Sequence, residues 1–383
     1  MNIPTRRVLF LMSDTGGGHR SAAEAIADAL VDDFPGRYKV TLVDVIKRTA
    51  IFPFNHVPDW YLPFTTYAEF LWRLLFYLTN NRVVVRGSRR FVDLLMGRSL
   101  RRMLREQAAD LVVSVHPVLN ASPYRALRAT GSRAPFVVVV TDLFSAHRIW
   151  FNPAVDLTLV PTDGARNVGL SCGVRPEKMK VVGLPVSLEF LDNRKSKAEH
   201  RVELGLDLDR TTVLIVGGGE GMGRIFEIVH AIDAARLPLQ VVVIAGRNQK
   251  LYRRLQAAEW QGPVRVQGFV TNMPAWMRAS DVIITKAGPG TISEALACGL
   301  PILLSGFLPG QEEGNVTFVQ ENGVGIMCEK PAEIAQTLAG WLVPNDHTLA
   351  NFAACAKQLA RPQAAQEIAR ILDGILTAQK SIV

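Results

Sequence analysis

The chain has 383 residues, of which 48% are hydrophobic and 20% charged. This balance excludes a disordered chain and indicates a globular protein of two or three domains, at about 150 residues per domain. Its four cysteines form no CxxC pair and have no histidine at metal-ligand spacing, which excludes a disulfide scaffold and a zinc finger and favours a reducing compartment. The net charge of +8 lies in the first half, because residues 1–190 carry 24 Lys and Arg against 16 Asp and Glu, whereas residues 191–383 carry 19 of each.

The first apolar run is Val8–Met12, which is too short for the apolar region of a signal peptide and is typical of a buried strand. It leads into TGGGHRS (15–21), where glycines precede a helical pattern. Glycines allow backbone N–H groups to approach a ligand, and the start of a helix favours an anion. Two other interpretations stay open: a turn that only packs helix on strand, or a dinucleotide site. Against the latter, Ser21 stands in place of the third glycine of that motif.

His19 follows these glycines directly. The start of a helix lowers the pKa of an imidazole, which keeps it neutral and able to accept a proton. His19 is therefore a candidate general base. The alternative is a histidine that only caps or packs the helix.

Residues 51–105 combine an aromatic-rich run (51–78) with nine arginines and one acid in residues 73–105. Apolar rings followed by cations suit an anionic membrane surface. The apolar run is interrupted by Arg73 and prolines, which argues against a transmembrane span. A buried helix pair with a solvated arginine face is the alternative, and no pattern of a nucleic-acid-binding module accompanies the cluster. Within it, RRFVDLLMGRSLRRMLR (89–105) predicts a basic amphipathic helix in the plane of the membrane, with Val92, Met96, Leu100 and Met103 on one stripe. The proposed membrane-contacting cations are Arg90, Arg98, Arg101, Arg102 and Arg105.

Short β-branched runs alternate with helical stretches along the whole chain, and a second glycine-rich turn, GGGEGMG (217–223), follows the run 211–216. This alternation predicts an α/β protein with two doubly wound parallel sheets in tandem. The expected strands are 38–43, 111–115, 136–140, 157–160, 239–244, 264–266, 282–285 and 301–304. We place the domain boundary in the polar segment 192–203, which gives domains 1–190 and 191–360. The final helix, 361–383, could pack on either domain.

The turn in KAGPGTISEALACGLP (286–301) should present the first N–H groups of a helix at the carboxyl edge of the second sheet. Thr291 can cap this helix. Glu294, near its first turn, could accept hydrogen bonds from a sugar diol or could cap the helix. The loop GQEEGN (310–315) gathers Gln, Glu and Asn side chains that can bind sugar hydroxyls, although a solvated loop looks similar.

Together with SVHP (114–117), VVTDLFSAHRIWFNP (139–153) and VVGLPV (181–186), these motifs resemble the monogalactosyldiacylglycerol synthase and processive diacylglycerol glucosyltransferase family. The resemblance implies the GT-B fold, in which two doubly wound domains face each other across a cleft. The nucleotide-sugar would bind the second domain and the lipid acceptor the first.

The resemblance also implies site residues. His19 matches the base or base-orienting group, and Asp142 could orient the imidazole or act as an alternative base. In the donor site, Phe269 and Val270 would hold uracil, Gly288–Thr291 the diphosphate, Glu294 the ribose, and Gln311 and Glu312 the hexose. The donor-binding set is Gly219, Phe269, Val270, Gly288, Pro289, Gly290, Thr291, Glu294, Gln311, Glu312 and Asn315. The acceptor-side set is Gly17, Gly18, His116, His147 and Trp150.

The expected activity is an inverting transfer of galactose or glucose from UDP-galactose or UDP-glucose to diacylglycerol. No DxD pair occurs, so we expect neither a metal nor another cofactor. The expected partners are these substrates and anionic membrane lipids, with no nucleic acid. The expected location is the cytoplasmic face of the cell membrane, as a peripheral protein. Transfer to a polyprenyl-linked acceptor, as in lipid II synthesis, and a non-catalytic UDP-sugar sensor are the alternatives.

Overall fold

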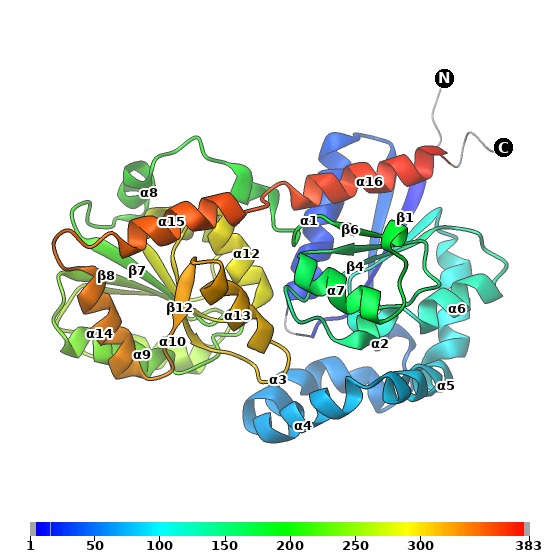
Figure 1. Cartoon of the computed structure of the whole chain (residues 1–383), viewed down its shortest axis with the longest axis horizontal. Helices are drawn as coiled ribbons and strands as arrows, with labels where there is room; N and C mark the ends of the chain where they lie inside the picture. Colours follow the sequence, from blue (N-terminus) through cyan, green and yellow to red (C-terminus); the bar gives the residue numbers. More distant parts are fainter. Residues whose placement is uncertain (1–4, 16, 379–383) are drawn as a thin grey trace. The chain divides into compact units, whose positions relative to one another are not determined.

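The computed structural model describes residues 5–15 and 17–378. The chain separates into two compact units. The first comprises the residues up to Leu188, the segment Pro309–Gln311 and the residues from Gln363 onward; the second comprises Glu189–Leu308 and Glu312–Pro362. Each unit contains a six-stranded sheet whose neighbouring strands are all parallel (Figure 1).

The first sheet has the strand order β2-β1-β3-β4-β5-β6. Its strands are β1 (Arg6–Met12), β2 (Tyr38–Asp44), β3 (Leu111–Ser114), β4 (Phe136–Val139), β5 (Leu157–Val160) and β6 (Met179–Val181). The order reverses next to β1, because β2 lies on one side of it and β3 on the other. In a doubly wound sheet such a reversal opens a crevice at the carboxyl ends of the strands, where ligands bind.

Helices cover both faces of the first sheet, as the alternation of side chains along β1 shows. Val8, Phe10 and Met12 pack with α1 and the C-terminal helix α16, whereas Leu9 and Leu11 pack with α5 and α6. The helices of this unit are α1 (Gly18–Asp33), α2 (Val45–Thr49), α3 (Val57–Tyr67), α4 (Glu69–Thr79), α5 (Arg82–Gln107), α6 (Ser122–Ala129), α7 (Asp163–Ser171) and α16 (Ala364–Ala378). Short 3-10 turns are η1 (Phe54–His56), η2 (Pro117–Leu119), η3 (Arg148–Trp150) and η4 (Pro176–Lys178).

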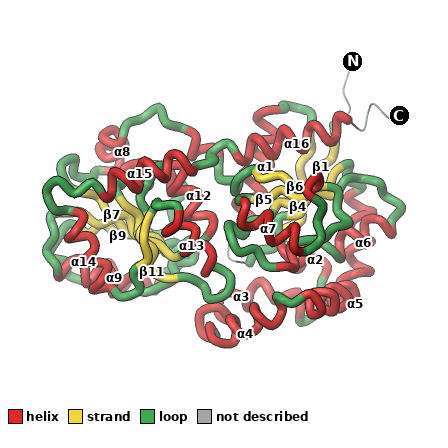
Figure 2. Tube along the Cα trace, in the orientation of Figure 1, coloured by secondary structure: helices red, strands yellow, loops and turns green. Residues whose placement is uncertain are grey.

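The second sheet has the order β12-β11-β10-β7-β8-β9, which reverses next to β7 (Figure 2). Its strands are β7 (Thr211–Val216), β8 (Leu239–Ile244), β9 (Val264–Gln267), β10 (Val282–Lys286), β11 (Ile302–Gly306) and β12 (Gly325–Met327). Its helices are α8 (Lys197–Leu204), α9 (Ile225–Ala234), α10 (Gln249–Gln256), α11 (Met273–Ala279), α12 (Pro289–Ala297), α13 (Glu313–Glu321), α14 (Pro331–Trp341) and α15 (Thr348–Leu359), with η5 (Leu188–Leu191) leading into the unit. The helices α9 and α14 pack on one face of the sheet with Ile215, Val243 and Ile284.

The prediction of two doubly wound sheets is confirmed, and each expected run overlaps an observed strand. The polar segment 192–203 contains most of helix α8. A capping box starts this helix, because the Ser196 hydroxyl accepts a hydrogen bond from the backbone N–H of Glu199 while the Glu199 carboxylate accepts one from the backbone N–H of Ser196. Within residues 5–15 and 17–378, no helix is long and apolar enough to cross a membrane.

Candidate active site

His19 lies in the first turn of α1, at the carboxyl end of β1. The helix begins at Gly18, and its N-cap residue Gly17 has φ +79°, a left-handed conformation that glycine adopts without strain. Apart from their chain neighbours and the backbone of α1, no described residue comes within 4 Å of where a Cβ would stand on Gly17 or Gly18. The space beside these two glycines, directly before His19, is therefore open among the described residues. Gly16 lies outside the described residues.

The half-buried imidazole of His19 is held by the neighbouring strand ends. Its Nδ1 lies 2.8 Å from Oγ1 of Thr141, the residue that directly precedes Asp142. Burial lowers its pKa from 6.5 to about 4, and a hydrogen bond to the backbone of Val115 opposes that shift. The ring is consequently neutral at pH 7 and can accept a proton.

A second histidine, His116, packs against His19. The ring centroids are 4.6 Å apart in an edge-to-face arrangement, and Nε2 of His116 lies 3.0 Å from Oγ1 of Thr15. His116 is almost fully buried, and burial together with the nearby His19 lowers its pKa. Its Nδ1 is buried without a hydrogen-bond partner in the structure. Both imidazole rings are therefore neutral at pH 7, so His116 places no positive charge beside the candidate base.

The loop after β4 supplies the other wall around His19. The buried carboxylate of Asp142 accepts a 2.6 Å hydrogen bond from Nε1 of Trp150, and a 3.4 Å bond from the backbone N–H of His147. The ring of Trp150 is fully buried, with its centroid 6.0 Å from that of His19. Thr141 is thus the residue whose side chain contacts Nδ1 of His19. The Asp142 carboxylate instead accepts hydrogen bonds from Trp150 and His147 of its own loop. The structure brings His19, His116, Asp142, His147 and Trp150 together through contacts at the carboxyl ends of the first sheet's strands.

In the second unit, the glycine-rich turn after β7 is packed backbone to backbone against the turn after β8. A Cβ on Gly221 would stand 2.2 Å from the carbonyl oxygen of Ala245, and one on Gly246 would stand 2.4 Å from that of Gly219. The backbone N–H of Arg247 donates to the Gly219 carbonyl at 2.8 Å. Glycines are therefore required here by close packing, whatever ligand the turn binds.

Phe269 and Val270, predicted to contact uracil, follow β9 in this unit. Phe269 is 54% exposed, and the guanidinium of Arg247 lies 4.6 Å from its ring centroid. The same guanidinium pairs with Glu220 at 3.0 Å. Arg247 therefore joins the glycine-rich turn to Phe269, a contact that the sequence pattern does not reveal.

Helix α12 begins earlier than its sequence suggests. Its N-cap residue is Gly288 and its first residue is Pro289, so Gly290 and Thr291 lie inside the first turn. The expectation that Thr291 caps the helix is wrong, because no side chain caps this end. Apart from its chain neighbours and the backbone of α12, no atom of the described residues lies within 4 Å of where a Cβ would stand on Gly290. The first N–H groups of α12 are therefore available to a ligand anion.

Glu294 lies in the second turn of α12 and not in the first. Burial raises the pKa of its carboxyl from 4.5 to about 7. Glu294 is the sixth residue of the helix, too far from its start to cap the first turn. A half-buried carboxylate with a raised pKa is suited to accept hydrogen bonds from a ligand.

The GQEEGN loop is divided between the units. Glu312, at the N-cap of α13, is buried; it pairs with Lys286 at the end of β10 and accepts a 2.9 Å hydrogen bond from the backbone of Leu308. The buried Asn315 donates to the carbonyl of Ala287 at 2.8 Å. Gln311 belongs with the first unit, where its side-chain oxygen accepts a 3.2 Å hydrogen bond from Tyr61. The ammonium of Lys286 lies beside the Gly288 turn, 3.1 Å from where a Cβ would stand on Gly288. The sequence did not predict this cation.

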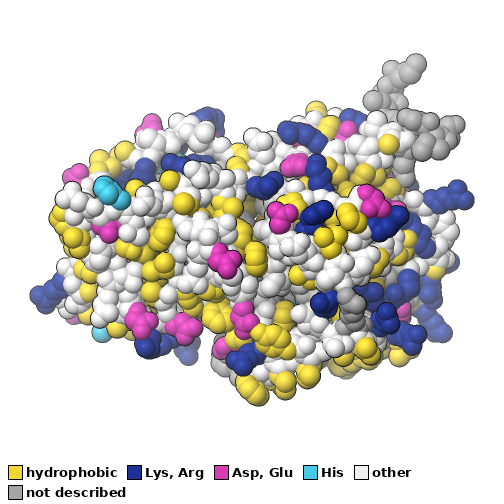
Figure 3. Space-filling view, in the orientation of Figure 1, with side chains coloured by type: hydrophobic (Ala, Val, Ile, Leu, Met, Phe, Trp, Pro, Cys, Tyr) yellow, Lys and Arg dark blue, Asp and Glu magenta, His cyan; other side chains and the backbone are white. Residues whose placement is uncertain are grey.

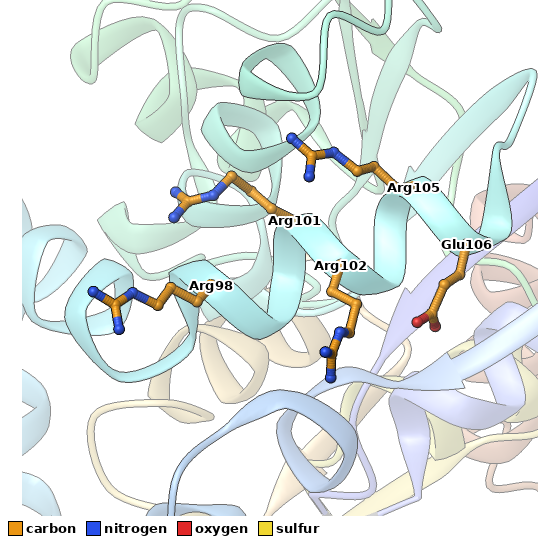
Figure 4. A pocket seen from close by; sticks show the side chains of 5 residues that line it. All are labelled: Arg98, Arg101, Arg102, Arg105 and Glu106. Atoms are coloured by element: carbon orange, nitrogen blue, oxygen red, sulfur yellow. The ribbon is translucent and has the colours of Figure 1, made fainter.

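The five arginines proposed to contact the membrane lie on helix α5. Four of them, with Glu106, line a pocket of about 340 Å³. Figure 4 shows Arg101 and Arg105 on one side of the helix, and Arg102 on the other side with Glu106. The apolar stripe of α5 is not available to a bilayer, because Met96, Leu100 and Met103 are buried in the core of the first unit and Val92 packs against it. The expectation that this stripe faces outward from α5 is therefore wrong, whereas membrane contact by the arginines stays a prediction.

Exposed apolar side chains lie on α4 and also elsewhere on α5, where Val83, Phe91 and Leu94 are 73%, 51% and 80% exposed. Phe70, Leu71 and Leu78 of α4 are 77%, 52% and 58% exposed. Figure 3 shows hydrophobic side chains along the edge where α3 and α4 lie, with Lys and Arg side chains beside them toward α5. The first unit therefore presents an apolar surface next to a basic one. We call these surfaces the α4 face (Phe70, Leu71, Leu74, Leu75, Tyr77, Leu78) and the α5 arginines (Arg90, Arg98, Arg101, Arg102, Arg105).

Three residues near the candidate sites were not predicted, and only one had a local signal. Thr141 directly precedes the strand-end Asp142 and could have been found from that position. Arg247 and Lys286 meet their partners through long-range packing. Among the residues that the structure describes, no group of three or more His, Cys, Asp and Glu side chains could hold a metal ion.

Sequence comparison matches both units to known families. Residues 19–186 match the family described as "Monogalactosyldiacylglycerol (MGDG) synthase", and residues 212–368 match the "Glycosyltransferase family 28 C-terminal domain". The chain is 40% identical over 374 residues to a probable chloroplastic monogalactosyldiacylglycerol synthase of Nicotiana tabacum, covering 95% of this chain and 70% of that protein. It is 39% identical over 380 residues to the chloroplastic monogalactosyldiacylglycerol synthase of Spinacia oleracea, covering 97% and 73%.

Solved structures share the fold at low identity. Acinetobacter baumannii MurG matches with a TM-score of 0.61 at 16% identity, covering 96% of this chain and 99% of that one. Anabaena HepE in complex with UDP-glucose matches with a TM-score of 0.58 at 15% identity, covering 96% and 99%. The two doubly wound sheets and these neighbours show the GT-B fold, and the family matches place the chain among the glycosyltransferases. Within that class, the chain belongs to the monogalactosyldiacylglycerol synthase family.

Proposed function

We propose that this protein transfers a hexose from a UDP-sugar to the hydroxyl of diacylglycerol, with inversion at the anomeric carbon. The observation that carries the proposal is the neutral, half-buried His19 behind an open glycine turn, in a chain of the monogalactosyldiacylglycerol synthase family. The names of the relatives favour galactose over glucose as the hexose.

In this proposal the first unit activates the acceptor. An imidazole nitrogen of His19 accepts the proton of the diacylglycerol hydroxyl while its oxygen attacks the anomeric carbon. Thr141 fixes the ring through Nδ1, and Trp150 and His116 hold it by packing. The low pKa keeps the base unprotonated before the reaction, and a positioned general base contributes about 10²–10⁴ in rate.

The second unit would hold the donor and stabilise the departing UDP. The bond from the anomeric carbon to the diphosphate breaks as the new bond forms, and UDP leaves with the electron pair. The uncapped start of α12 and the ammonium of Lys286 would stabilise the charge that develops on the diphosphate. Glu294 would accept hydrogen bonds from the ribose hydroxyls, and no metal is part of this proposal.

The acceptor lies in a bilayer, so the first unit must reach a lipid surface. The α4 face offers exposed apolar side chains, and the α5 arginines offer charge complementary to anionic lipids. Each arginine near such a surface contributes about 1 kcal/mol before screening by salt. We therefore propose a peripheral membrane protein that binds anionic lipids.

A transfer assay tests the proposed reaction. The protein is incubated with liposomes that contain diacylglycerol and with radiolabelled UDP-galactose or UDP-glucose, and the labelled lipid is extracted. We expect a labelled glycolipid whose linkage is β, because the donor linkage is α. Label that appears only with a polyprenyl-linked acceptor would contradict the proposal. Tight binding of UDP-galactose without any transfer would favour the sensor alternative.

A charge variant tests the membrane surface. Changing Arg98, Arg101, Arg102 and Arg105 to Gln keeps helix propensity and removes four charges. We expect weaker sedimentation with phosphatidylglycerol liposomes, and a smaller effect of salt than in the wild type. Wild-type sedimentation of this variant at both low and high salt would show that the arginines are only a solvated face.

A further inference from the structure

The C-terminal end of α4 is attached directly to the loop that surrounds His19. Asn80 accepts a 2.9 Å hydrogen bond from the backbone N–H of Arg148 through its side-chain oxygen. The hydroxyl of Thr79 lies 3.3 Å from Nε2 of His147. The ring of Phe76 packs edge to face on the His147 ring, with centroids 4.9 Å apart. Phe76 is also the buried residue of a helix whose other large apolar side chains are largely exposed.

The hydrogen bonds define the tautomer of His147. Its Nδ1 accepts a 3.1 Å bond from the backbone N–H of Ile149, so the ring proton is on Nε2. The hydroxyl of Thr79 donates its own proton to the carbonyl of Leu75 at 2.7 Å, and the proton on the His147 ring is shared between the Thr79 oxygen, 3.3 Å from Nε2, and the backbone of Phe76. This arrangement requires a neutral His147, and burial lowers its pKa to about 4. The contact is thus fully formed at neutral pH.

The same loop continues to the candidate base. The backbone N–H of His147 bonds Asp142, whose carboxylate also holds the indole of Trp150 against His19. Thr141, one residue before Asp142, bonds Nδ1 of His19. Every step from α4 to the imidazole is therefore a direct contact within the first unit, and a displaced α4 would displace the partners of His19.

We propose that Thr79, Asn80 and His147 are positioning residues that couple the seating of α4 on a lipid surface to the alignment of His19. The inference rests on the proposed function and adds to it: diacylglycerol presented in a bilayer is turned over faster than the same acceptor presented as a dispersed, short-chain molecule. The bilayer is the occupant that the structure favours for the α4 face, because the α5 arginines beside it complement anionic lipid.

The experiment compares the wild type with a Thr79→Val, Asn80→Leu double variant. These changes remove both polar contacts to the loop and nearly conserve side-chain volume, and neither residue is part of the proposed catalytic or donor-binding machinery. Turnover is measured with diacylglycerol in phosphatidylglycerol vesicles and with monomeric dioctanoylglycerol. Vesicle sedimentation and UDP-galactose binding are measured in parallel.

A Thr377→Val, Asn322→Leu variant is the matched control. The hydroxyl of Thr377 makes the same bond to the residue four positions earlier in α16, and Asn322 is the C-cap residue of α13, as Asn80 is of α4. Neither touches the loop 142–150 through a contact that the structure shows. The control should behave like the wild type on both acceptors.

We expect the wild type to show a higher kcat on vesicles than on monomeric acceptor. The kcat of the variant on vesicles should be about ten- to hundredfold lower than that of the wild type, which is the scale expected for misplaced catalytic groups. Its KM for UDP-galactose and its vesicle binding should stay at the wild-type values. Equal kcat in variant and wild type on vesicles would overturn the coupling. Equal losses on both acceptors would also overturn it, because they would indicate a general structural defect. A wild type that is inactive on both acceptors would instead refute the proposed function.

Discussion

The raised pKa of Glu294 allows a test of whether its carboxylate binds the donor or is only a buried structural group. Burial shifts the pKa of this carboxyl from 4.5 to about 7. If the ribose hydroxyls donate to the carboxylate, only the deprotonated form binds well. With a pKa near 7, the deprotonated fraction rises about tenfold between pH 6 and pH 8. The affinity for UDP-galactose should therefore be about tenfold higher at pH 8.

The same pKa shift makes the folded protein less stable as the pH rises, although the affinity for the donor increases. The folded protein holds the proton more tightly than the unfolded chain, so the free energy of unfolding falls as the pH rises from about 4.5 to about 7. A shift from 4.5 to about 7, at about 1.4 kcal/mol per pKa unit, corresponds to a cost of roughly 3–4 kcal/mol at pH 8. The Glu294→Gln variant removes the ionisation and should have a higher Tm at pH 8. It should also bind UDP-galactose about tenfold more weakly, because a charged acceptor is replaced by a neutral one.

Calorimetric titration and thermal unfolding at pH 6, 7 and 8 measure both effects. UDP-galactose is the suitable ligand because its diphosphate is esterified at both ends and does not titrate in this range. Glu321→Gln, which changes an exposed glutamate at the end of α13, is the matched control. A wild-type affinity that does not change with pH, together with undiminished affinity in Glu294→Gln, would refute the role of Glu294 in donor binding.

Four further predictions concern the proposed reaction. His19→Ala should lower kcat by about 10²–10⁴ while the Kd for UDP-galactose stays unchanged, and near-normal turnover would transfer the role of base to Asp142. At saturating UDP-galactose, where the titration of Glu294 does not limit donor binding, the acidic limb of the wild-type kcat profile should lie near pH 4 and not near 6.5, because burial lowers the pKa of His19 and only the neutral ring accepts a proton. Thr141→Val should lower kcat about tenfold, and Thr141→Ser should restore it because the hydroxyl returns. Full activity should survive a chelator; loss of activity that Mg²⁺ or Mn²⁺ restores would contradict stabilisation of UDP by α12 and Lys286.

The sheets could be predicted from the sequence because strands of a parallel sheet are buried on both faces and therefore appear as continuous apolar runs. Val213–Val216 and Val282–Ile284 are examples, and both are buried in the second unit. The edge strands β6 and β12 were not predicted. Each has three residues, and Lys180 in β6 is exposed, so neither stands out as an apolar run.

The candidate base could be predicted because a glycine turn between a strand and a helix is a local signal. Its environment could not be predicted, because Thr141 is 122 residues away from His19 and reaches it only through the parallel order β1-β3-β4. The same limit applies to Glu294. Its place on a helix is visible in the sequence, but its pKa depends on how the packed unit excludes water.

Helix α5 shows why amphipathicity alone does not identify a membrane helix. An apolar stripe opposite a row of arginines is compatible with packing on a sheet or with lying on a bilayer, and the spacing of Met96, Leu100 and Met103 is the same in both cases. In the structure the stripe packs on the sheet, since these three side chains are at most 5% exposed. In the proposed membrane contact, the apolar area would then come from the α4 face and from exposed side chains such as Phe91 and Leu94, while the α5 arginines contribute charge. Because apolar burial is not screened by salt whereas attraction to arginine is, high salt should weaken the binding of the first unit to membranes without abolishing it.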